Sequence, residues 1–475
     1  MSDYKQYFKG KKVTVLGLGL LGKRLGDIAF LAECGAKVLV TDLKPSTALR
    51  PSLKALRKYT HSTKLSAGNI KYILGEHRFE DFEKCDFVLK GQGVALDSPY
   101  IKHAKKKGIP IEMDESLFAK LAPKVKIIGV TGTRGKTTTT VLIYEILKEA
   151  FSNPSTALGT KKPRVFLGGN IRGTAALPLL KDVQDGDFVV FELSSWQLQG
   201  FGEAKISPYI SVFTNFMPDH MNYYGSTTLT TSKALERYFK DKSYIFKFQK
   251  KNDVLILGFS MKNLVKNTKS KKIYANIKNI PKSWHINLPG AHNLENISCA
   301  VEVARFLKID EEIIRKTIKH FNPISGRLEY IKNIKGIDIY NDNNSTTPEA
   351  TQVALKALSL ISPKSDIGEK KIVLIMGGTD KNLELKKLVE NIKKYAKAVI
   401  LMPGNGTNRI SPLLHKIKKL PIHREKDLKD VVLKAYSVAE KGDIILYSPA
   451  FTSFGMFHNE YDRGEQFMKI VKQLK

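Results

Sequence analysis

One stretch constrains the fold of this 475-residue chain more than any other. Residues 125–130 form an apolar run typical of a strand, a turn through Gly132 and Gly135 follows, and Lys136 opens a segment with apolar positions at helical spacing. A strand, a glycine turn and a helix start in this order make an anion cradle, because backbone N–H groups at a helix N-terminus point at phosphate oxygens. The sequence therefore predicts a nucleotide-phosphate loop between a buried strand and a helix.

The side chains of this loop fit phosphoryl transfer. Lys136 can reach the β- and γ-phosphates of a nucleotide, and the hydroxyl of Thr137 can hold Mg²⁺. The strict P-loop pattern has a glycine five residues before Gly135, where this chain has Val130. The stretch is therefore a P-loop variant. A chance glycine-lysine-threonine turn is the weaker alternative, because it does not explain the flanking strand and helix.

A second glycine-rich turn lies near the start of the chain. Residues 12–16 are a predicted strand, the motif Gly17-Leu-Gly-Leu-Leu-Gly22 follows, and the next predicted strand leads to Asp42. These glycines let the backbone approach a diphosphate closely, and the acid can accept a hydrogen bond from a ribose hydroxyl. The alternative is a tight strand-to-helix turn of the kind that any α/β domain contains.

Two polar side chains follow buried strands further along. Glu192 comes directly after the apolar run 188–191, and His220 follows the run 209–214. Ligands of α/β proteins bind at the carboxyl ends of parallel strands, so both residues are metal-ligand candidates. The alternatives are a solvent-facing glutamate at a helix start and a structural histidine. Asn293 and Asn296 precede a helix predicted over 297–307, where capping is favoured over contact with a base.

The net charge is +32, from 78 Lys and Arg against 46 Asp and Glu. Such a chain can bind nucleic acid, a membrane surface or small anions. The lysines are spread along the whole chain, and no basic stripe interleaved with aromatic residues occurs. A generally basic surface is therefore favoured over nucleic-acid binding.

The length of the apolar runs, the polarity of the first residues and the spacing of the cysteines indicate the location of the protein. No apolar run approaches the roughly 20 residues that a membrane span needs. Residues 1–12 are polar, so a secretory signal is not expected. Cys34, Cys85 and Cys299 stand far apart, which indicates reduced thiols in a cytoplasmic protein without a disulfide framework or a zinc site.

Predicted strands alternate with predicted helices along the whole chain, which is typical of α/β domains with parallel-rich sheets. The length allows two to four such domains. We expect three: a Rossmann-like domain at 1–123, a central P-loop ATPase domain at 124–321, and a C-terminal α/β domain at 322–475.

Six motifs in order carry a family resemblance. They are G-T-x-G-K-T-T at 132–138, E-L-S-S-x-Q-L at 192–198, N-x-x-P-D-H at 215–220, H-N-x-x-N at 292–296, G-R-x-E at 326–329 and S-P-A-x-x-S-F at 448–454. Together they resemble the Mur ligases, and within that family the branch that adds D-glutamate to UDP-N-acetylmuramoyl-L-alanine in peptidoglycan precursor synthesis. The resemblance implies a UDP-binding first domain, an ATPase domain and a third domain for the incoming amino acid. It also implies an acyl-phosphate intermediate.

The resemblance implies a role for each motif. The residues expected at ATP are Gly132, Thr133, Arg134, Gly135, Lys136, Thr137, Thr138, Asn293, Asn296, Arg327 and Asp342. Those expected at the UDP-linked substrate, with the first glycine turn included, are Gly17, Gly19, Leu20, Leu21, Gly22, Asp42 and Asn170. Those expected at the amino acid are Thr346, Lys381, Ser453 and Phe454. The expected catalytic residues are Lys136, Glu192, His220 and Lys242, and the expected Mg²⁺ ligands are Thr137, Glu192, His220 and Lys242.

The family also carries a carbamylated lysine in a Y-x-x-x-K segment. Tyr238 and Lys242 fit this segment best, whereas Lys233 is the nearer candidate by distance from His220. An ordinary lysine is a cation and repels Mg²⁺. A carbamate at Lys242 is an anion that can help to position the metal.

The chain departs from the family pattern at three places. Gly91-Gln-Gly93 stands where the family has S-P-G, Asn344 replaces a lysine, and Glu460 stands at a usual aromatic position, with Tyr461 next to it. The second and third departures leave the identity and stereochemistry of the added amino acid open.

Other enzyme classes explain less of the sequence. An NAD-dependent dehydrogenase accounts for residues 17–42 but leaves the P-loop unused, and a P-loop nucleic-acid motor accounts only for the charge. A folate-glutamate ligase would share the P-loop without needing a UDP-binding domain. We expect a monomer that uses ATP and Mg²⁺ and acts on small molecules, with no nucleic-acid or membrane partner.

Overall fold

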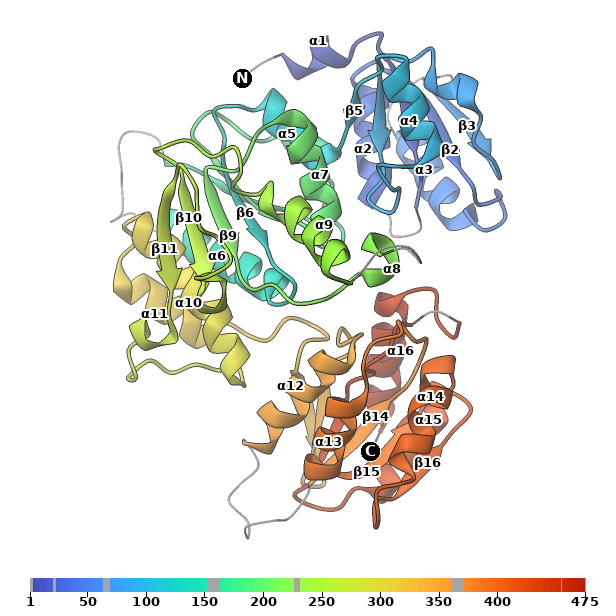
Figure 1. Ribbon diagram of the computed structural model, residues 1–475, viewed down its shortest axis with the longest axis vertical. Helices are drawn as coiled ribbons and strands as arrows, with labels where there is room; N and C mark the ends of the chain where they lie inside the picture. The colour runs from blue at the N-terminus through green and yellow to red at the C-terminus, as the bar shows by residue number, and fades with distance from the viewer. Residues whose placement is uncertain are drawn as a thin grey trace. The chain divides into compact units, whose positions relative to one another are not determined.

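The computed structural model describes residues 3–19, 23–62, 69–152, 162–225, 231–360, 371–453 and 455–474. The chain divides into two compact units, one of Met1–Lys282 with Glu295–Thr317 and one of Ser283–Leu294 with Ile318–Lys475. The described residues form three sheets, two in the first unit and one in the second (Figure 1). The predicted α/β class is confirmed, and the domain boundaries at 123 and 321 stay predictions.

The first sheet has the strand order β3-β2-β1-β4-β5, and its strands pair in parallel. The strands are β1 (Lys12–Leu16), β2 (Lys37–Asp42), β3 (Ile70–Leu74), β4 (Phe87–Lys90) and β5 (Ile111–Glu112). The helices are α1 (Tyr4–Phe8), α2 (Lys23–Glu33), α3 (Arg50–Ser62), η2 (Phe79–Phe82) and α4 (Pro99–Lys106), of which α2, α3 and α4 are drawn around the sheet in Figure 1. The strand order reverses between β1 and β4, so the carboxyl ends of these strands border the crevice in which such sheets bind ligands.

The second sheet has the order β11-β10-β9-β6-β8-β7 and also pairs in parallel. Its strands are β6 (Lys126–Thr131), β7 (Val165–Gly169), β8 (Phe188–Glu192), β9 (Ile210–Phe213), β10 (Val254–Gly258) and β11 (Lys271–Ala275). The helices of this part of the chain are α5 (Asp114–Leu121), α6 (Lys136–Ser152), η4 (Leu177–Lys181), α7 (Ser195–Ala204), α8 (Met221–Tyr224), α9 (Thr231–Ser243), η5 (Phe259–Met261), η6 (Ile277–Asn279), α10 (Ala291–Phe306) and α11 (Glu311–His320). Strand β6 lies between β8 and β9, so the P-loop that follows it leaves the middle of the sheet.

The third sheet has the order β12-β13-β17-β14-β15-β16. Its strands are β12 (Glu329–Ile334), β13 (Ile337–Asn341), β14 (Ile372–Met376), β15 (Ala396–Leu401), β16 (Ile422–Arg424) and β17 (Ile444–Tyr447). Its helices are α12 (Pro348–Ser359), α13 (Lys386–Tyr395), α14 (Asn405–Leu414), α15 (Leu428–Val438) and α16 (Glu460–Gln473). The edge strand β12 pairs antiparallel with β13, while the other pairs are parallel.

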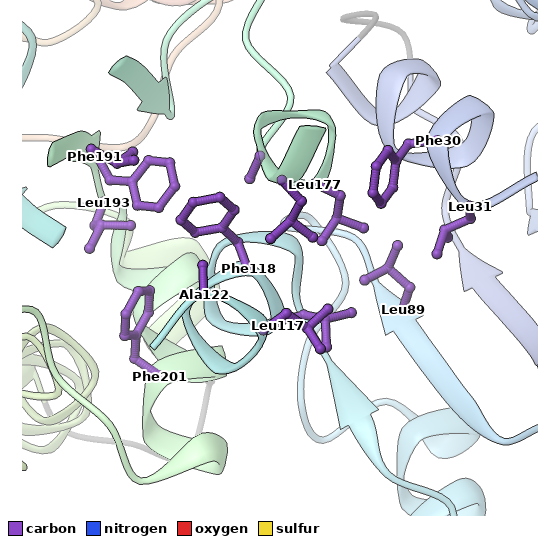
Figure 2. Close-up of a cluster of buried hydrophobic side chains, with 14 of the residues drawn as sticks. Phe30, Leu31, Leu89, Leu117, Phe118, Ala122, Leu177, Phe191, Leu193 and Phe201 are labelled. Atoms are coloured by element: carbon purple, nitrogen blue, oxygen red, sulfur yellow. The ribbon is translucent and has the colours of Figure 1, made fainter. Parts of the chain in front are cut away.

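The first two sheets share one hydrophobic core, with α5 in its centre (Figure 2). Phe30 of α2 and Leu89 of β4 come from the first sheet, and Phe191 of β8 comes from the second. Phe118 of α5 lies among them, with its ring centroid 5.4 Å from that of Phe191 at an edge-on angle of 80°. The hydrophobic core therefore continues from the first sheet to the second sheet, which carries the P-loop.

Replacing Phe118 by alanine should destabilise the first unit by about 3–5 kcal/mol, because the change removes a fully buried ring and leaves a cavity. Urea unfolding followed by circular dichroism measures this loss. Phe259→Ala is the matched control, since this ring is 60% exposed and its removal should change stability by under about 0.5 kcal/mol. Equal effects of the two substitutions would contradict a shared core around α5.

Candidate active site

The P-loop is shaped by two glycines that leave no room for a side chain. Gly132 has a φ of +150° and Gly135 a φ of +80°. A Cβ on Gly132 would lie 1.9 Å from the Thr214 hydroxyl oxygen, and a Cβ on Gly135 would lie 1.9 Å from Oδ1 of Asn296. The loop is thus packed directly against the segment after β9 and against α10. Asn296, predicted to contact ATP, lies against the loop that would hold the phosphates.

The first residues of α6 carry the polar groups of the loop. The Lys136 ammonium donates to the carbonyl oxygens of Gly132 at 3.1 Å and Thr133 at 3.2 Å, so it lies folded over the loop. Thr137 is half-buried and Thr138 is buried, both in the first turn of the helix. Lysine and hydroxyl groups at these positions are those that a P-loop presents to phosphates and Mg²⁺.

The segment after β9 fastens the loop through two residues to which the sequence assigned no role. The Asn215 side chain accepts from the Arg134 backbone N–H at 2.8 Å and donates to the Arg134 carbonyl at 3.2 Å. The Arg134 guanidinium donates to the buried Asp219 carboxylate at 2.8 Å. Both residues belong to the N-x-x-P-D-H motif, so the signal that could have identified them was present.

Glu192 is the last residue of β8 rather than the residue after it, because the ladder with β6 continues through Val130. Its side chain is buried, and Oε1 accepts from the Asn170 amide at 3.2 Å. The other oxygen, Oε2, is also buried and has no hydrogen-bond partner within the described part of the chain. A buried carboxylate oxygen without a partner is costly, so the arrangement fits a site for a cation.

His220 lies two strands away from Glu192 in the sheet order, just before α8, with a φ of +56°. Its Nε2 is 3.7 Å from Oδ2 of Asp219, and its ring centroid is 4.7 Å from that of Trp196 on α7. The ring is therefore near the Asp219 carboxylate, which pairs with Arg134 of the P-loop, and near the Trp196 indole.

The residues present fit a Mg²⁺ ion that is bound partly by protein oxygens and partly by substrate phosphates and water. Among the described residues, no three His, Cys, Asp or Glu side chains gather so as to hold a metal by themselves. Mg²⁺ is usually bound by one or two carboxylates with substrate phosphates and water, so the orphaned oxygen of Glu192 and the hydroxyl of Thr137 are suitable ligands. His220 offers a nitrogen, which Mg²⁺ favours less than oxygen.

Lys242 of α9 is fully buried against the same loop. Its ammonium donates to the Gly132 carbonyl at 2.8 Å and to the Thr131 hydroxyl at 3.4 Å. Burial, and then the nearby charge of Lys136, place the pKa of Lys242 well below its usual value. Lys233, on the same helix, is exposed. Of the two lysines that the sequence left open, Lys242 is therefore the one that contacts the P-loop.

The glycine turn of the first sheet is organised by Asp42. Gly17 and Gly19 have positive φ values at the carboxyl end of β1. Oδ2 of Asp42 accepts from the backbone N–H groups of Leu18 at 2.9 Å and Gly19 at 3.3 Å. The carboxylate thus holds the turn itself, and its contact with a ribose stays a prediction. Of the predicted substrate residues, Leu20, Leu21 and Gly22 lie outside the described residues.

A buried lysine supports the loop that departs from the family pattern. Lys90, the last residue of β4, donates to the carbonyls of Gly91 at 3.2 Å and Val94 at 2.8 Å. Arg24 of α2 donates to the Lys90 carbonyl at 3.1 Å. Burial, followed by the charge of Arg24, lowers the pKa of Lys90 to about 7. The loop 91–94 is therefore fastened at the crevice between β1 and β4.

In the second unit, three strand-end loops are joined by backbone hydrogen bonds. Thr379 and Thr452 exchange N–H to carbonyl bonds at 3.0 Å, and Ala450 donates to the Ser345 carbonyl at 2.9 Å. These bonds bring together the loops that carry Thr346, Lys381 and Ser453. Three of the predicted amino-acid contacts thus lie on connected loops, and the fourth, Phe454, lies outside the described residues.

Arg327 and Asp342 also lie together in this unit. The buried Asp342 carboxylate accepts from the Ser448 hydroxyl at 2.7 Å and from the Leu328 N–H at 3.1 Å. Burial raises the pKa of Asp342 to about 6, against the opposing effect of these hydrogen bonds and of the charge of Arg327. Arg327 and Asp342, both predicted to contact the nucleotide, therefore lie in one polar cluster.

The prediction that Asn293 and Asn296 cap a helix is wrong. Helix α10 begins at Ala291, directly after Pro289-Gly290, so both asparagines lie inside it. The apolar periodicity starts only at residue 297, because the first turns are polar. The Asn293 amide donates to the Pro289 carbonyl at 2.8 Å, and Asn296 packs on Gly135 as described above.

Comparisons with known proteins identify the family of this chain. Three family models fit the chain: "Mur ligase MurD-like, N-terminal domain" at residues 11–112, "Mur ligase middle domain" at 130–280, and "Mur ligase, glutamate ligase domain" at 326–451. A curated relative from Borreliella afzelii (strain PKo), named UDP-N-acetylmuramoylalanine–D-glutamate ligase, is 34% identical over 98% of both chains. The chain belongs to the Mur ligase family. A relative of the same name from Roseiflexus sp. (strain RS-1) is 32% identical, again over 98% of both chains.

Solved structures share the fold of this Mur ligase. The UDP-N-acetylmuramate-alanine ligase MurC from Thermotoga maritima superposes with a TM-score of 0.60 at 18% identity, covering 98% of this chain and 100% of that one. MurF from Acinetobacter baumannii gives a TM-score of 0.54 at 13% identity, covering 99% and 93%. At these identities the likeness concerns the fold alone.

The sequence also predicted reduced cysteine thiols and no membrane-spanning segment. Cys34, Cys85 and Cys299 are buried free thiols, and burial raises the pKa of Cys34 to about 11 and that of Cys299 to about 12. In the described ranges, no helix is both long and apolar enough to cross a membrane.

Replacing Gly135 by alanine should weaken ATP binding at least about tenfold, because the new Cβ would overlap Oδ1 of Asn296 and displace the loop. Calorimetric titration with ATP measures the affinity. Gly186→Ala is a matched control: its φ of +90° imposes similar backbone strain, but a Cβ there meets nothing within 4 Å. If both variants bind ATP equally well, the contact with Asn296 does not shape the nucleotide site.

Proposed function

We propose that this Mur ligase uses ATP to join D-glutamate to UDP-N-acetylmuramoyl-L-alanine, as a step in peptidoglycan precursor synthesis. The observation that carries the proposal is the P-loop in the middle of the second sheet, bonded to buried Lys242 and bordered by β8, which ends at Glu192. Relatives named UDP-N-acetylmuramoylalanine–D-glutamate ligase, at 32–34% identity over nearly the full length, support the choice of substrates.

The first chemical step brings two anions together, since the substrate carboxylate must attack the γ-phosphate of ATP. Lys136 and the backbone N–H groups of the P-loop would hold the triphosphate and offset the charge that spreads over the transferred phosphoryl group. Mg²⁺, held by Glu192 and Thr137 with His220 and a carbamate at Lys242, would supply further neutralisation of phosphate charge. The product is an acyl phosphate together with ADP.

In the second step the amine of the amino acid attacks the acyl phosphate. A tetrahedral intermediate forms and collapses to the amide with release of inorganic phosphate. The joined loops that carry Thr346, Lys381 and Ser453 would bind the amino acid, with the Lys381 ammonium opposite a carboxylate of D-glutamate. Exclusion of water would protect the acyl phosphate from hydrolysis.

Carbamylation of Lys242 is part of the proposal. A neutral amine adds to CO₂ to give a carbamate and releases one proton, so the reaction needs an unprotonated lysine. The burial of Lys242 and its closeness to Lys136 both favour the neutral amine, as the lowered pKa reflects. The resulting anion would replace a cation beside the proposed metal.

The first sheet would hold the UDP-linked substrate. The turn at Gly17 and Gly19 borders the crevice between β1 and β4, and Asn170, hydrogen bonded to Glu192, would contact the muramoyl part. We further propose domain boundaries at residues 123 and 321 and a cytoplasmic location, which the buried free thiols support. The expected monomeric state stays a prediction.

A second candidate is a Mur-type ligase that adds a different amino acid. Asn344, which stands where the family has a lysine, donates to the Ser325 carbonyl at 3.2 Å and carries no charge. The Glu460 carbonyl accepts from Asn343 at 2.6 Å, at the start of α16. These two substitutions lie on elements next to the proposed amino-acid loops and would alter their charge.

Phosphate release should require ATP, UDP-N-acetylmuramoyl-L-alanine and D-glutamate together, because the acyl phosphate forms only on the UDP-linked acid and turns over only with an amine. A coupled phosphate assay with a panel of D- and L-amino acids measures this. L-glutamate is the control for stereochemistry. Turnover with another amino acid would select the second candidate, and ATPase activity driven by nucleic acid would refute both.

Lys242→Ala should lower kcat by roughly 10- to 100-fold or more, because it removes the group proposed to support the metal, while Lys233→Ala should retain full activity. Steady-state phosphate release measures both variants. A carbamate signal in ¹³C NMR after growth with labelled bicarbonate should disappear only in the Lys242 variant. Full activity of Lys242→Ala would move the carbamate to Lys233 or remove it from the mechanism.

A further inference from the structure

Three helices of the first unit follow or contain three of the four side chains proposed to hold the metal, and the fourth, Thr137, lies at the start of α6. Glu192 ends β8 shortly before α7 begins, His220 directly precedes α8, and Lys242 lies within α9. Helices α7 and α8 both pack against α9. The relative placement of these helices therefore decides whether the three proposed ligands can meet at one point.

One carboxylate joins all three helices. Asp241 of α9 accepts at Oδ2 from the Gln199 amide of α7 at 2.7 Å and from the Tyr224 hydroxyl of α8 at 3.0 Å. The same Gln199 amide also donates to the Tyr223 hydroxyl at 3.2 Å. Gln199 and Tyr224 are both buried, so water does not readily compete for either hydrogen bond. Hydrogen bonds to a charged acceptor are stronger than those between neutral groups.

Asp241 and Lys242 are neighbours that point in different directions. Successive residues of a helix are roughly 100° apart, so Lys242 can bond to the P-loop while Asp241 bonds to α7 and α8. Helix α9 is therefore fastened on two sides. Loss of the Asp241 contacts would free the helix to rotate or shift and would carry Lys242 away from Gly132.

The same network extends to the first sheet. Burial raises the pKa of Tyr223 and the backbone of Leu96 opposes this shift, so Leu96 lies near the hydroxyl that accepts from Gln199. Leu96 follows the loop that Lys90 holds at the carbonyls of Gly91 and Val94. The helices around the proposed metal thus lie near the loop at the crevice of the first sheet.

We infer that Asp241 is a positioning residue that orients the proposed metal ligands by joining α7, α8 and α9, an inference that rests on the proposed function. Groups that orient metal ligands without touching the metal typically change metal affinity or activity by 10- to 100-fold when they are replaced. The sequence motifs assign no role to Asp241, Gln199 or Tyr223.

The test measures Mn²⁺ affinity, with free Mn²⁺ followed by electron paramagnetic resonance in the presence of ATP and without the other substrates. Asp241→Ala should bind Mn²⁺ roughly 10- to 100-fold more weakly than the wild type. The KM for D-glutamate should not change, because Thr346, Lys381 and Ser453 belong to the other unit. Glu236→Gln is the matched control, since Glu236 is exposed on the same helix, and it should bind Mn²⁺ as the wild type does.

Tyr224→Phe is the second variant, and it decides the question if Asp241→Ala does not fold. It keeps the ring and removes only one of the two donors to Asp241, so a smaller loss of Mn²⁺ affinity is expected. Wild-type Mn²⁺ affinity in folded Asp241→Ala, or in Tyr224→Phe where the first variant fails to fold, overturns the inference. A wild-type protein that forms no product from the three proposed substrates refutes the proposed function instead.

Discussion

The candidate site depends on the close approach of a bare backbone to its neighbours at Gly132 and Gly135. A Cβ at either position would collide with Thr214 or Asn296, so only glycine allows the loop to lie in this conformation. Segments far apart in the sequence thereby surround one turn: the strand β6, the connection after β9 and the helix α10. Each of them contributes a polar group, and the middle position of β6 in the sheet is what brings them within reach.

The charges around this turn are arranged for an anionic ligand. Arg134 is paired with Asp219, whereas Lys136 and Lys242 hydrogen bond to uncharged oxygens of the loop. Burial lowers the pKa of Lys242, and the nearby charge of Lys136 lowers it further. A triphosphate would relieve this repulsion. The same repulsion favours the neutral amine of Lys242, which is the form that adds to CO₂.

The shared core gives the first unit a second kind of organisation. Phe118 and its neighbours make the first two sheets one hydrophobic body, so the turn at Gly17 and the P-loop belong to a single packed unit. The loops proposed for the amino acid are built separately, at the carboxyl ends of β13, β14 and β17. A ligase with three substrates can thus evolve its amino-acid loops, including Asn344, without disturbing the nucleotide loop.

The sequence by itself determined the α/β class, most strands and the nucleotide loop, because apolar runs, glycine turns and helical periodicity are local signals. The motifs also named most of the candidate site. Tertiary structure alone decided that Asp42 binds the turn of its own sheet and that α10 starts before its apolar face does. It also placed Lys242, which the Y-x-x-x-K segment already favoured over Lys233, against the P-loop. It alone revealed Asp241 as the junction of three helices. These features depend on which strands and helices lie side by side, and contacts between residues distant in sequence leave no periodic pattern in the chain.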